Sequence, residues 1–246
     1  MKDFIYYKYG VFMNSLFKLS TLSVLVLSFS VGAVTLDYRH EYKADSKTNA
    51  DRLKLSHTTQ EGYFASVEGK LAESTNLLSD GFKEGNGHYS GNGSEWELGR
   101  NFKITDSFTL APAVNLDIGD TFVGYRVQIK AIYKITDNWV TTFRWRPGIQ
   151  VDEKSSVANK NYNQFNWEFG YVGDKFTVMS DYEYRFTNYE DYEGDHNYWL
   201  YNIVATLPID KNWTPYTEIG VVPRYNANHD KDDMEMRYRL GIKYNF

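Results

Sequence analysis

Cysteine is absent from the 246 residues of the chain. Without cysteine the chain can form neither a disulfide framework nor a thiolate-ligated metal site. The absence of cysteine does not argue against export from the cytoplasm, because an exported protein need not contain disulfides. Disorder is excluded for a different reason, since aromatic residues make up 17% of the chain and include 21 tyrosines.

Long hydrophobic runs are almost as scarce. Only one stretch approaches the length of roughly 18 apolar residues that a transmembrane helix requires, and it lies near the N-terminus. A helical membrane protein with several spans is therefore excluded. An excess of positive charge is also missing, because the formal net charge is −5, which argues against a generally basic nucleic-acid-binding protein.

The apolar stretch at 16–33 has the composition of a secretory signal peptide. A lysine supplies positive charge, an apolar core follows, and Val-Gly-Ala at 31–33 places small residues at a cleavage site. We expect residues 1–33 to be a cleaved signal peptide and residues 34–246 to form a single domain. Polar residues precede Met13, which is therefore a second candidate for the start. A buried core helix is the alternative interpretation of this stretch.

After this stretch, apolar and polar residues alternate with a period of two, which is typical of a β-strand with two different faces. In the last segment, MEMRYRLGIKYNF, apolar or aromatic residues alternate with polar, mostly charged, residues and one glycine. No helical period competes with this pattern. We expect about twelve strands, at 34–43, 51–58, 62–71, 95–102, 108–116, 122–133, 139–147, 162–171, 176–187, 196–207, 213–225 and 234–246.

The connections between these segments alternate between short and long, and the short connection at 117–121 is the exception. Two short connections share the sequence Lys-Ile-Thr-Asp, in which we expect the aspartate to accept local backbone hydrogen bonds. The glycine-rich stretch 85–93 is expected to be a flexible loop, since no helix follows it as a phosphate-binding loop would require. Apart from 117–121, the predicted short connections are 59–61, 103–107, 134–138, 172–175 and 208–212, and the predicted long ones are 44–50, 72–94, 148–161, 188–195 and 226–233.

The apolar faces could meet in a soluble β-sandwich or face lipid, and three features favour lipid. The strands are roughly 10 residues long, enough to cross a bilayer when tilted. Short turns alternate with long loops, as in outer-membrane barrels. Tryptophans mark strand ends, as in aromatic girdles, at Trp96, Trp139, Trp199 and Trp213. The predicted fold class is all-β, a transmembrane antiparallel up-and-down β-barrel of about 12 strands, closed so that no strand edge remains.

An even number of strands returns the chain to its starting side. We therefore expect both termini to be periplasmic and the loops 72–94 and 148–161 to be extracellular. The last strand ends in Phe246, which resembles the signal read by the outer-membrane assembly machinery. The expected location is the outer membrane of a Gram-negative bacterium, with the lipids of that membrane and the assembly machinery as partners.

Arginines are sorted between the two faces of the predicted strands. Nine of the ten share the parity of the predicted lumen, and only Arg100, close to a turn, has outward parity. Arginine presents a rigid planar fork to carboxylates, and spaced forks let an anion pass from site to site without being trapped. The candidate pore-lining and substrate-binding residues are Arg39, Arg52, Lys54, Arg126, Lys130, Arg144, Arg146, Arg185, Arg224, Arg237, Arg239 and Lys243.

In a closed barrel the last strand pairs with the first, so the candidates near the two termini cluster on one wall. Those at 126–146 lie opposite, and two basic tracks face each other across the pore. The alternative is a lattice of salt bridges that only braces the wall. We favour anion conduction because the arginine clusters exceed the nearby carboxylates. The carboxylates with inward parity are Asp37, Glu41, Glu68, Glu95, Glu97, Glu168, Asp181, Glu183, Glu218 and Glu235.

The chain resembles the oligogalacturonate-specific porins, a family that includes acidic-oligosaccharide and N-acetylneuraminate channels. The resemblance covers essentially all of 34–246 and rests on VTLDYRHEY, on FRWRPG and on the ending MRYRLGIKYNF. It implies a narrow monomeric barrel of twelve strands that carries uronic-acid oligomers between two basic tracks. Carried over residue by residue, it implies a first track of Arg39, Arg52, Arg224, Arg237 and Arg239, and a second of Arg126, Arg144 and Arg146.

The predicted function is uptake of acidic oligosaccharides of the uronic-acid or sialic-acid type, with oligogalacturonates as the first candidate. A general anion-preferring diffusion porin is the alternative. We expect no enzyme, because only His196 could approach Ser180 and nothing orients it as a base. No cofactor, metal or nucleic acid is expected, since no histidine pair has ligand spacing and the acidic stretch 230–233 is typical of a solvated loop.

Overall fold

A computed structural model describes residues 33–154, 156, 158–190, 194–226 and 233–246. The predicted signal peptide up to residue 32, and most of the acidic stretch 230–233, lie outside the described residues. Within the part described, no helix is long and apolar enough to cross a membrane. The strands are β1 (Ala33–Lys43), β2 (Asn49–Thr58), β3 (Tyr63–Leu77), β4 (Lys83–Arg100), β5 (Phe102–Lys103), β6 (Phe108–Ile118), β7 (Phe122–Lys134), β8 (Trp139–Asp152), β9 (Lys160–Val172), β10 (Thr177–Thr187), β11 (Asn197–Thr206), β12 (Trp213–Arg224) and β13 (Asp233–Asn245).

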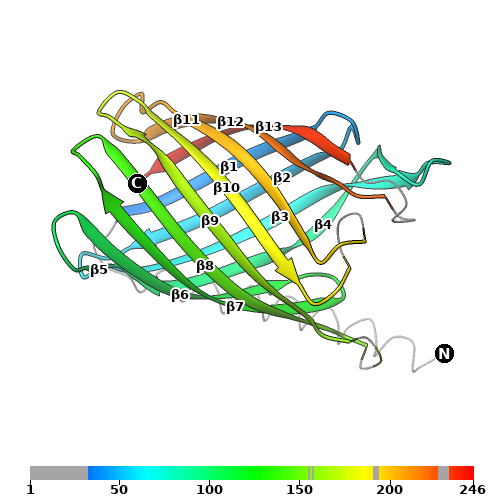
Figure 1. The fold of residues 1–246 in the computed structure, drawn as a ribbon. Coiled ribbons are helices and arrows are strands. Elements are labelled where there is room, and N and C mark those ends of the chain that lie inside the picture. The colour runs from blue at the N-terminus through cyan, green and yellow to red at the C-terminus, as the bar shows by residue number, and fades with distance from the viewer. Residues whose placement is uncertain (1–32, 155, 157, 191–193, 227–232) are drawn as a thin grey trace, which may run out of the picture.

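These strands form one closed antiparallel barrel (Figure 1). β1 pairs with both β2 and β13, and β4 closes the other seam by pairing with β6. The two-residue β5 follows β4 after Asn101 and also pairs with β6, so β4 and β5 together make one strand of the wall. The described wall therefore has twelve strands, and the predicted fold class is confirmed.

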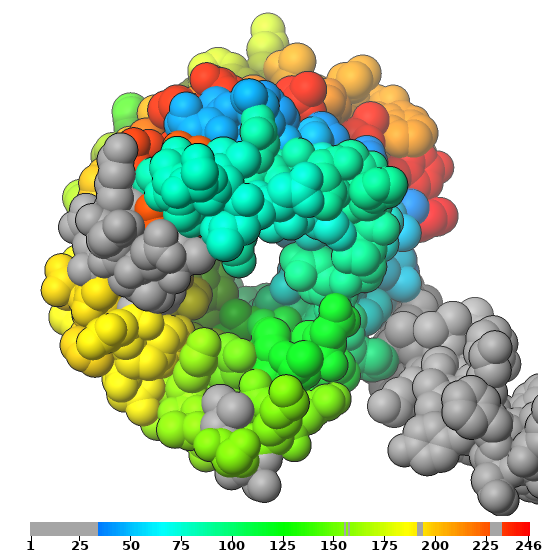
Figure 2. All heavy atoms as spheres, turned by 90° about the vertical axis from the view of Figure 1, so that its right-hand side faces the viewer, coloured from blue at the N-terminus to red at the C-terminus, as the bar shows by residue number. Residues whose placement is uncertain are grey.

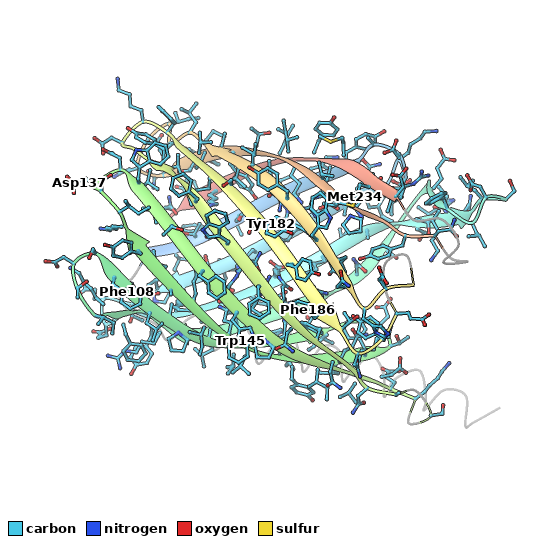
Figure 3. The ribbon with its side chains drawn as sticks, in the orientation of Figure 1. Phe108, Asp137, Trp145, Tyr182, Phe186 and Met234 are labelled. Carbon is cyan, nitrogen blue, oxygen red and sulfur yellow. The ribbon has the colours of Figure 1, made fainter. Side chains whose placement is uncertain are left out.

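Burial is the reverse of that in a soluble domain. The most buried large side chains include the polar Gln164 and Asn166, at 0% and 1% exposure, whereas Trp167 beside them is 57% exposed. Trp145 and Tyr182 also point away from the wall (Figure 3). An exterior of large apolar and aromatic side chains is stable against lipid and unstable against water, so the predicted direction of the two faces is confirmed.

Aromatic rings gather where the short turns lie. Trp139 begins β8 and stacks on Phe169 with ring centroids 5.3 Å apart, and Trp213 begins β12 with its ring 4.6 Å from that of Tyr244. Such rings suit the boundary between lipid and water. The prediction for Trp96 is wrong, because β4 already begins at Lys83 and Trp96 therefore lies inside the strand, not at its end.

The two Lys-Ile-Thr-Asp turns depend on threonine rather than aspartate. Thr105 Oγ1 accepts a hydrogen bond from the backbone N–H of Phe108 at 3.0 Å, and Thr136 accepts in the same way at 3.1 Å. Asp106 instead pairs with Lys103 at 2.9 Å, and this contact lowers the pKa of its carboxyl. The predicted role of the aspartate is therefore wrong here, because the hydroxyl of the threonine directly before it accepts the backbone hydrogen bond of the turn.

The prediction of a long loop at 72–94 is also wrong. Most of it belongs to a hairpin in which β3 and β4 continue beyond the rest of the barrel to a turn at 78–82 (Figure 1). Residues 85–93 lie within β4, and the predicted flexible loop there is a strand. The alternating pattern fails because both faces of this extension lie outside the lipid, while the backbone ladder still forms. The predicted loop 148–161 is likewise shorter, since β8 runs to Asp152 and β9 begins at Lys160.

The labelling of introduced cysteines tests the predicted topology, because the chain has none of its own. Ser79→Cys lies in the exposed turn of the β3–β4 hairpin, and Asp137→Cys in an exposed turn at the other end. We expect a membrane-impermeant maleimide to label Ser79→Cys on intact cells, and Asp137→Cys only after permeabilisation. The reverse labelling would place the termini outside the cell.

Asp210 gives the turn before β12 a dependence on pH. Its carboxylate accepts hydrogen bonds from the backbone N–H groups of Trp213 and Asn212, at 2.7 and 2.8 Å, and these bonds lower its pKa below the ordinary 3.8. The resulting stabilisation is complete above pH 3.8 and is lost as the pH falls through the lowered pKa. Asp210→Ala should therefore reduce the temperature of heat modification on gels at neutral pH, and the difference should vanish in strong acid. Asp137→Ala is the matched control, because among the described residues its carboxylate accepts no hydrogen bond; an equal loss there would contradict the prediction.

Candidate functional site: a charged lumen

The inward faces of the strands enclose a lumen that stays open at the loop end, beside the β3–β4 hairpin (Figure 2). The strand registers place all twelve predicted cations at inward parity. β1 and β8 are six strands apart in either direction around the wall, so their regions face each other. The first wall consists of β12, β13, β1 and β2, and it carries Arg224, Arg237, Arg239, Lys243, Arg39, Arg52 and Lys54. The second wall consists of β7 and β8, and it carries Arg126, Lys130, Arg144 and Arg146. Arg185 lies between the two walls, on β10.

Two arginines on β13 share carboxylates across three strands. Arg239 lies 2.6 Å from Glu41 on β1 and 2.7 Å from Glu218 on β12. Arg237 lies 3.1 Å from the same Glu218 oxygen. Both arginines are therefore largely neutralised by neighbours, as the salt-bridge lattice predicts. This cluster braces the wall at the seam where the two ends of the chain meet.

A second brace crosses the same seam. Asp37 on β1 lies 2.7 Å from Arg52 and accepts a hydrogen bond of 2.8 Å from the Tyr216 hydroxyl on β12. Tyr216 reaches Asp37 by passing over β13 at Gly241, where a Cβ would have no room. Glycine at this position thus lets a side chain bridge two strands that are not neighbours. Glu68 completes the set, 3.5 Å from Arg52.

On the second wall, Arg126 is held by Glu95 at 2.7 Å. Lys70 on β3 also lies 3.4 Å from Glu95, and 3.6 Å from Asp117 on β6. Lys70 was not among the predicted site residues, although its inward parity could be read from the sequence. Its inward direction was expected, but it was left out of the candidate set because β3 belongs to neither of the two predicted tracks.

Amides organise the wall beside β8. Arg146 lies 3.5 Å from Glu183 and donates to Asn166 at 3.3 Å, and Arg185 donates to Gln164 at 2.6 Å. These buried amides accept from arginines and donate to carboxylates, so they reinforce the ion pairs of Glu183 and connect them to Asp181. Alternation predicted that Gln164 and Asn166 face inward, but no sequence signal assigned them this role.

The remaining pairs of the second wall are looser. Lys130 and Arg144 share Glu168 at 3.7 and 4.0 Å, distances at the outer limit of an ion pair. Two cations therefore divide one carboxylate, and neither forms a close hydrogen bond with it. A positive charge of this kind can exchange partners easily, because little is lost when the contact opens.

Four of the predicted cations have no carboxylate within 4.0 Å among the described residues: Arg39, Lys54, Arg224 and Lys243. Arg39 lines a cavity of about 290 Å³, and Lys54 and Lys243 line another of about 510 Å³. Lys243 lies 5.2 Å above the ring of Tyr216, and Arg224 lies 4.1 Å above that of Phe82. Uncompensated positive charge thus follows the first wall, whereas the arginines of the second wall are mostly paired.

A closed barrel with an aromatic lipid-facing exterior and an open, charged lumen defines an outer-membrane porin. The family model described as "Oligogalacturonate-specific porin protein (KdgM)" matches residues 27–246. The chain belongs to this family, and its location is the outer membrane of a Gram-negative bacterium.

Two relatives illustrate the family. The chain is 30% identical over 244 residues to the oligogalacturonate-specific porin KdgM of Dickeya dadantii (strain 3937), a match that covers 93% of this chain and 99% of the relative. It is 24% identical over 239 residues to the N-acetylneuraminic acid outer membrane channel protein NanC of Escherichia coli (strain K12), covering 90% and 95%. Both relatives are named as channels, not as enzymes.

Solved structures support the fold. A NanC porin superposes with a TM-score of 0.70 at 19% identity, covering 85% of this chain and 98% of that one. A KdgM porin superposes with a TM-score of 0.61 at 23% identity, covering 86% and 99%. Likeness at this identity shows the barrel fold alone.

The division into free and paired cations predicts the direction of changes in ion selectivity. We expect Arg39→Gln to weaken anion preference, because it removes an uncompensated charge. Glu218→Gln should strengthen the preference, because it releases Arg237 and Arg239 from their shared partner. The reversal potential under a salt gradient across a planar bilayer measures both, with Lys175→Gln in an exposed turn as the control. Shifts of the same sign in Arg39→Gln and Glu218→Gln would contradict the division.

Proposed function

We propose that this protein is a channel for the uptake of acidic oligosaccharides, with oligogalacturonates as the main candidate. The observation that carries the proposal is the row of uncompensated cations on the first wall, Arg39, Lys54 and Lys243. The names of the relatives support it, since oligogalacturonate and N-acetylneuraminic acid both present carboxylates. A solved KdgM porin is also described in complex with disordered oligogalacturonate.

The spacing of these cations suits successive carboxylates on one oligomer. Lys54 and Lys243 are both in register with Asp37, and Arg39 lies two residues further along β1. Two residues of a strand span about 7 Å, so an anion leaving Arg39 meets the next free charge within a short step. Asp37 stays engaged with Arg52 and Tyr216 and leaves the lysines available.

The second wall serves as a softer partner in this proposal. Lys130 and Arg144 hold Glu168 at 3.7 and 4.0 Å, so a carboxylate of the substrate can replace it at little cost. Exchange between weak sites prevents trapping, which conduction requires. The twelve cations predicted from the sequence are accordingly proposed as the pore-lining set, and Lys70 is added to it.

Further parts of the proposal follow from the sequence. The barrel acts as a monomer, residues 1–33 are a cleaved signal peptide, Phe246 is read by the assembly machinery, and the chain has no catalytic role. For the last point, His196 pairs through its backbone with Thr187, seven residues along β10 from Ser180, and Ser180 donates to the Phe169 carbonyl at 2.9 Å.

Removing one cation from each wall tests guided transport. We expect the double variant Arg39→Ala, Arg144→Ala to lower uptake of trigalacturonate into proteoliposomes about five- to twentyfold, and each single change to lower it about two- to fivefold. These factors correspond to roughly 0.5–1 kcal/mol for each charged contact in a wet pore. Maltotriose, a neutral trisaccharide, should pass unchanged in all three variants.

Lys175→Ala, in a turn outside the lumen, is the matched control for charge, and heat modification on gels shows that each variant is folded. Equal losses for both sugars would mean that the two arginines shape the pore without guiding carboxylates. Unchanged uptake of both sugars in the double variant would favour the general anion-preferring diffusion porin.

A further inference from the structure

Arg100 is the arginine that the lumen does not use. It ends β4 with outward parity, and Leu98, two residues earlier on the same face, is 57% exposed. Tyr63, opposite Arg100 on β3, is 48% exposed, and Phe102 is 40% exposed. The guanidinium therefore lies on the exterior, among side chains that face lipid, at the end of the barrel where the short turns lie.

Two rings hold the guanidinium in place. Its Cζ atom lies 4.6 Å from the ring centroid of Tyr63 and 4.8 Å from that of Phe102, and Nη1 donates to the Tyr63 hydroxyl at 3.2 Å. Nε is buried and has no hydrogen-bond partner. Stacking on aromatic rings restrains the side chain and does not neutralise its charge.

The backbone fixes this arrangement. Gly62 has φ +87° in the turn before β3, and the N–H of Asn101 donates to its carbonyl at 2.8 Å. A Cβ on Gly62 would lie 2.6 Å from the Asn101 carbonyl oxygen, so only glycine permits this approach. β4 and β5 keep one register against β6 across Asn101, so Arg100 and Phe102, two residues apart, lie on the same outward face of the wall.

No carboxylate lies within 4.0 Å of the Arg100 guanidinium among the described residues. The exposed Glu61 is close enough for the Arg100 charge to contribute to lowering its pKa, but it forms no ion pair with the guanidinium. An arginine with no carboxylate in ion-pair contact, on a lipid-facing surface and at the level of the aromatic rings that mark the membrane boundary, lies where lipid phosphates lie. We propose that Arg100, Tyr63 and Phe102 form a binding site for the phosphodiester of a phospholipid in the leaflet at the turn end. The guanidinium fork donates to the phosphate oxygens, and the rings contact the first carbons of the acyl chains.

Native mass spectrometry of the folded barrel in detergent tests this site with three probes. These are dioleoyl phosphatidylglycerol, dioleoylglycerol, which has the same chains without phosphate, and glycerol phosphate, which has no chains. We expect the wild type to retain the phospholipid, and Arg100→Gln to lower the bound fraction about three- to tenfold. Arg100→Lys should fall between them because lysine keeps the charge and loses the planar fork. Phe102→Leu should also reduce binding, because it removes one of the two restraining rings.

Lys103→Gln is the matched control, since it removes one positive charge from the same end, where Lys103 pairs with Asp106. Its phospholipid binding should equal that of the wild type, and dioleoylglycerol should bind all variants alike. Equal losses in Arg100→Gln and Lys103→Gln, or no loss in either, would overturn the proposal. Retention of glycerol phosphate as strong as that of the phospholipid would overturn the assignment to a lipid. Gel mobility before and after heating confirms that every variant compared is folded.

Discussion

Backbone hydrogen bonding inside a bilayer is the constraint on which the rest of this structure depends. Lipid offers no partner for a free N–H or carbonyl, so a sheet can span the membrane only when it has no edge. The pairings of β1 with β13 and of β4 with β6 remove both edges. Closure then assigns each strand one face toward lipid and one toward water, and the alternation of the sequence follows from that assignment.

Closure also decides which charges meet. The seam joins the two ends of the chain, so that Glu41 on β1 contacts Arg239 on β13, about two hundred residues away in sequence. Many inward arginines are neutralised in this way, and the lattice and the transport path share one set of side chains. The two interpretations of the arginines are therefore complementary, because the paired groups hold the wall and leave a few cations free.

The free cations are unevenly placed. Arg39, Lys54 and Lys243 follow one wall, while the arginines opposite mostly face their own carboxylates. Small backbone features support this placement. Gly241 leaves room for the Tyr216 hydroxyl to donate a hydrogen bond to Asp37, so that Asp37 is engaged and the neighbouring lysines stay unpaired. On the exterior Gly62 has a related role, because only glycine allows the close approach of Asn101 beside Tyr63 and Arg100. Both charged sites thus depend on a glycine that leaves room for a close approach.

The sequence by itself determined the barrel, its twelve strands, the inward face and the inward parity of twelve cations, because period-two alternation and strand length are local properties. It misplaced the β3–β4 extension, since a strand with water on both faces has no alternation to read, and it assigned the two Lys-Ile-Thr-Asp turns to aspartate where threonine is nearer. Only the tertiary structure decided which cations are free. Pairing depends on side chains of neighbouring strands, and residues such as Arg39 and Arg239 share the same parity and composition yet differ in whether a carboxylate lies within reach.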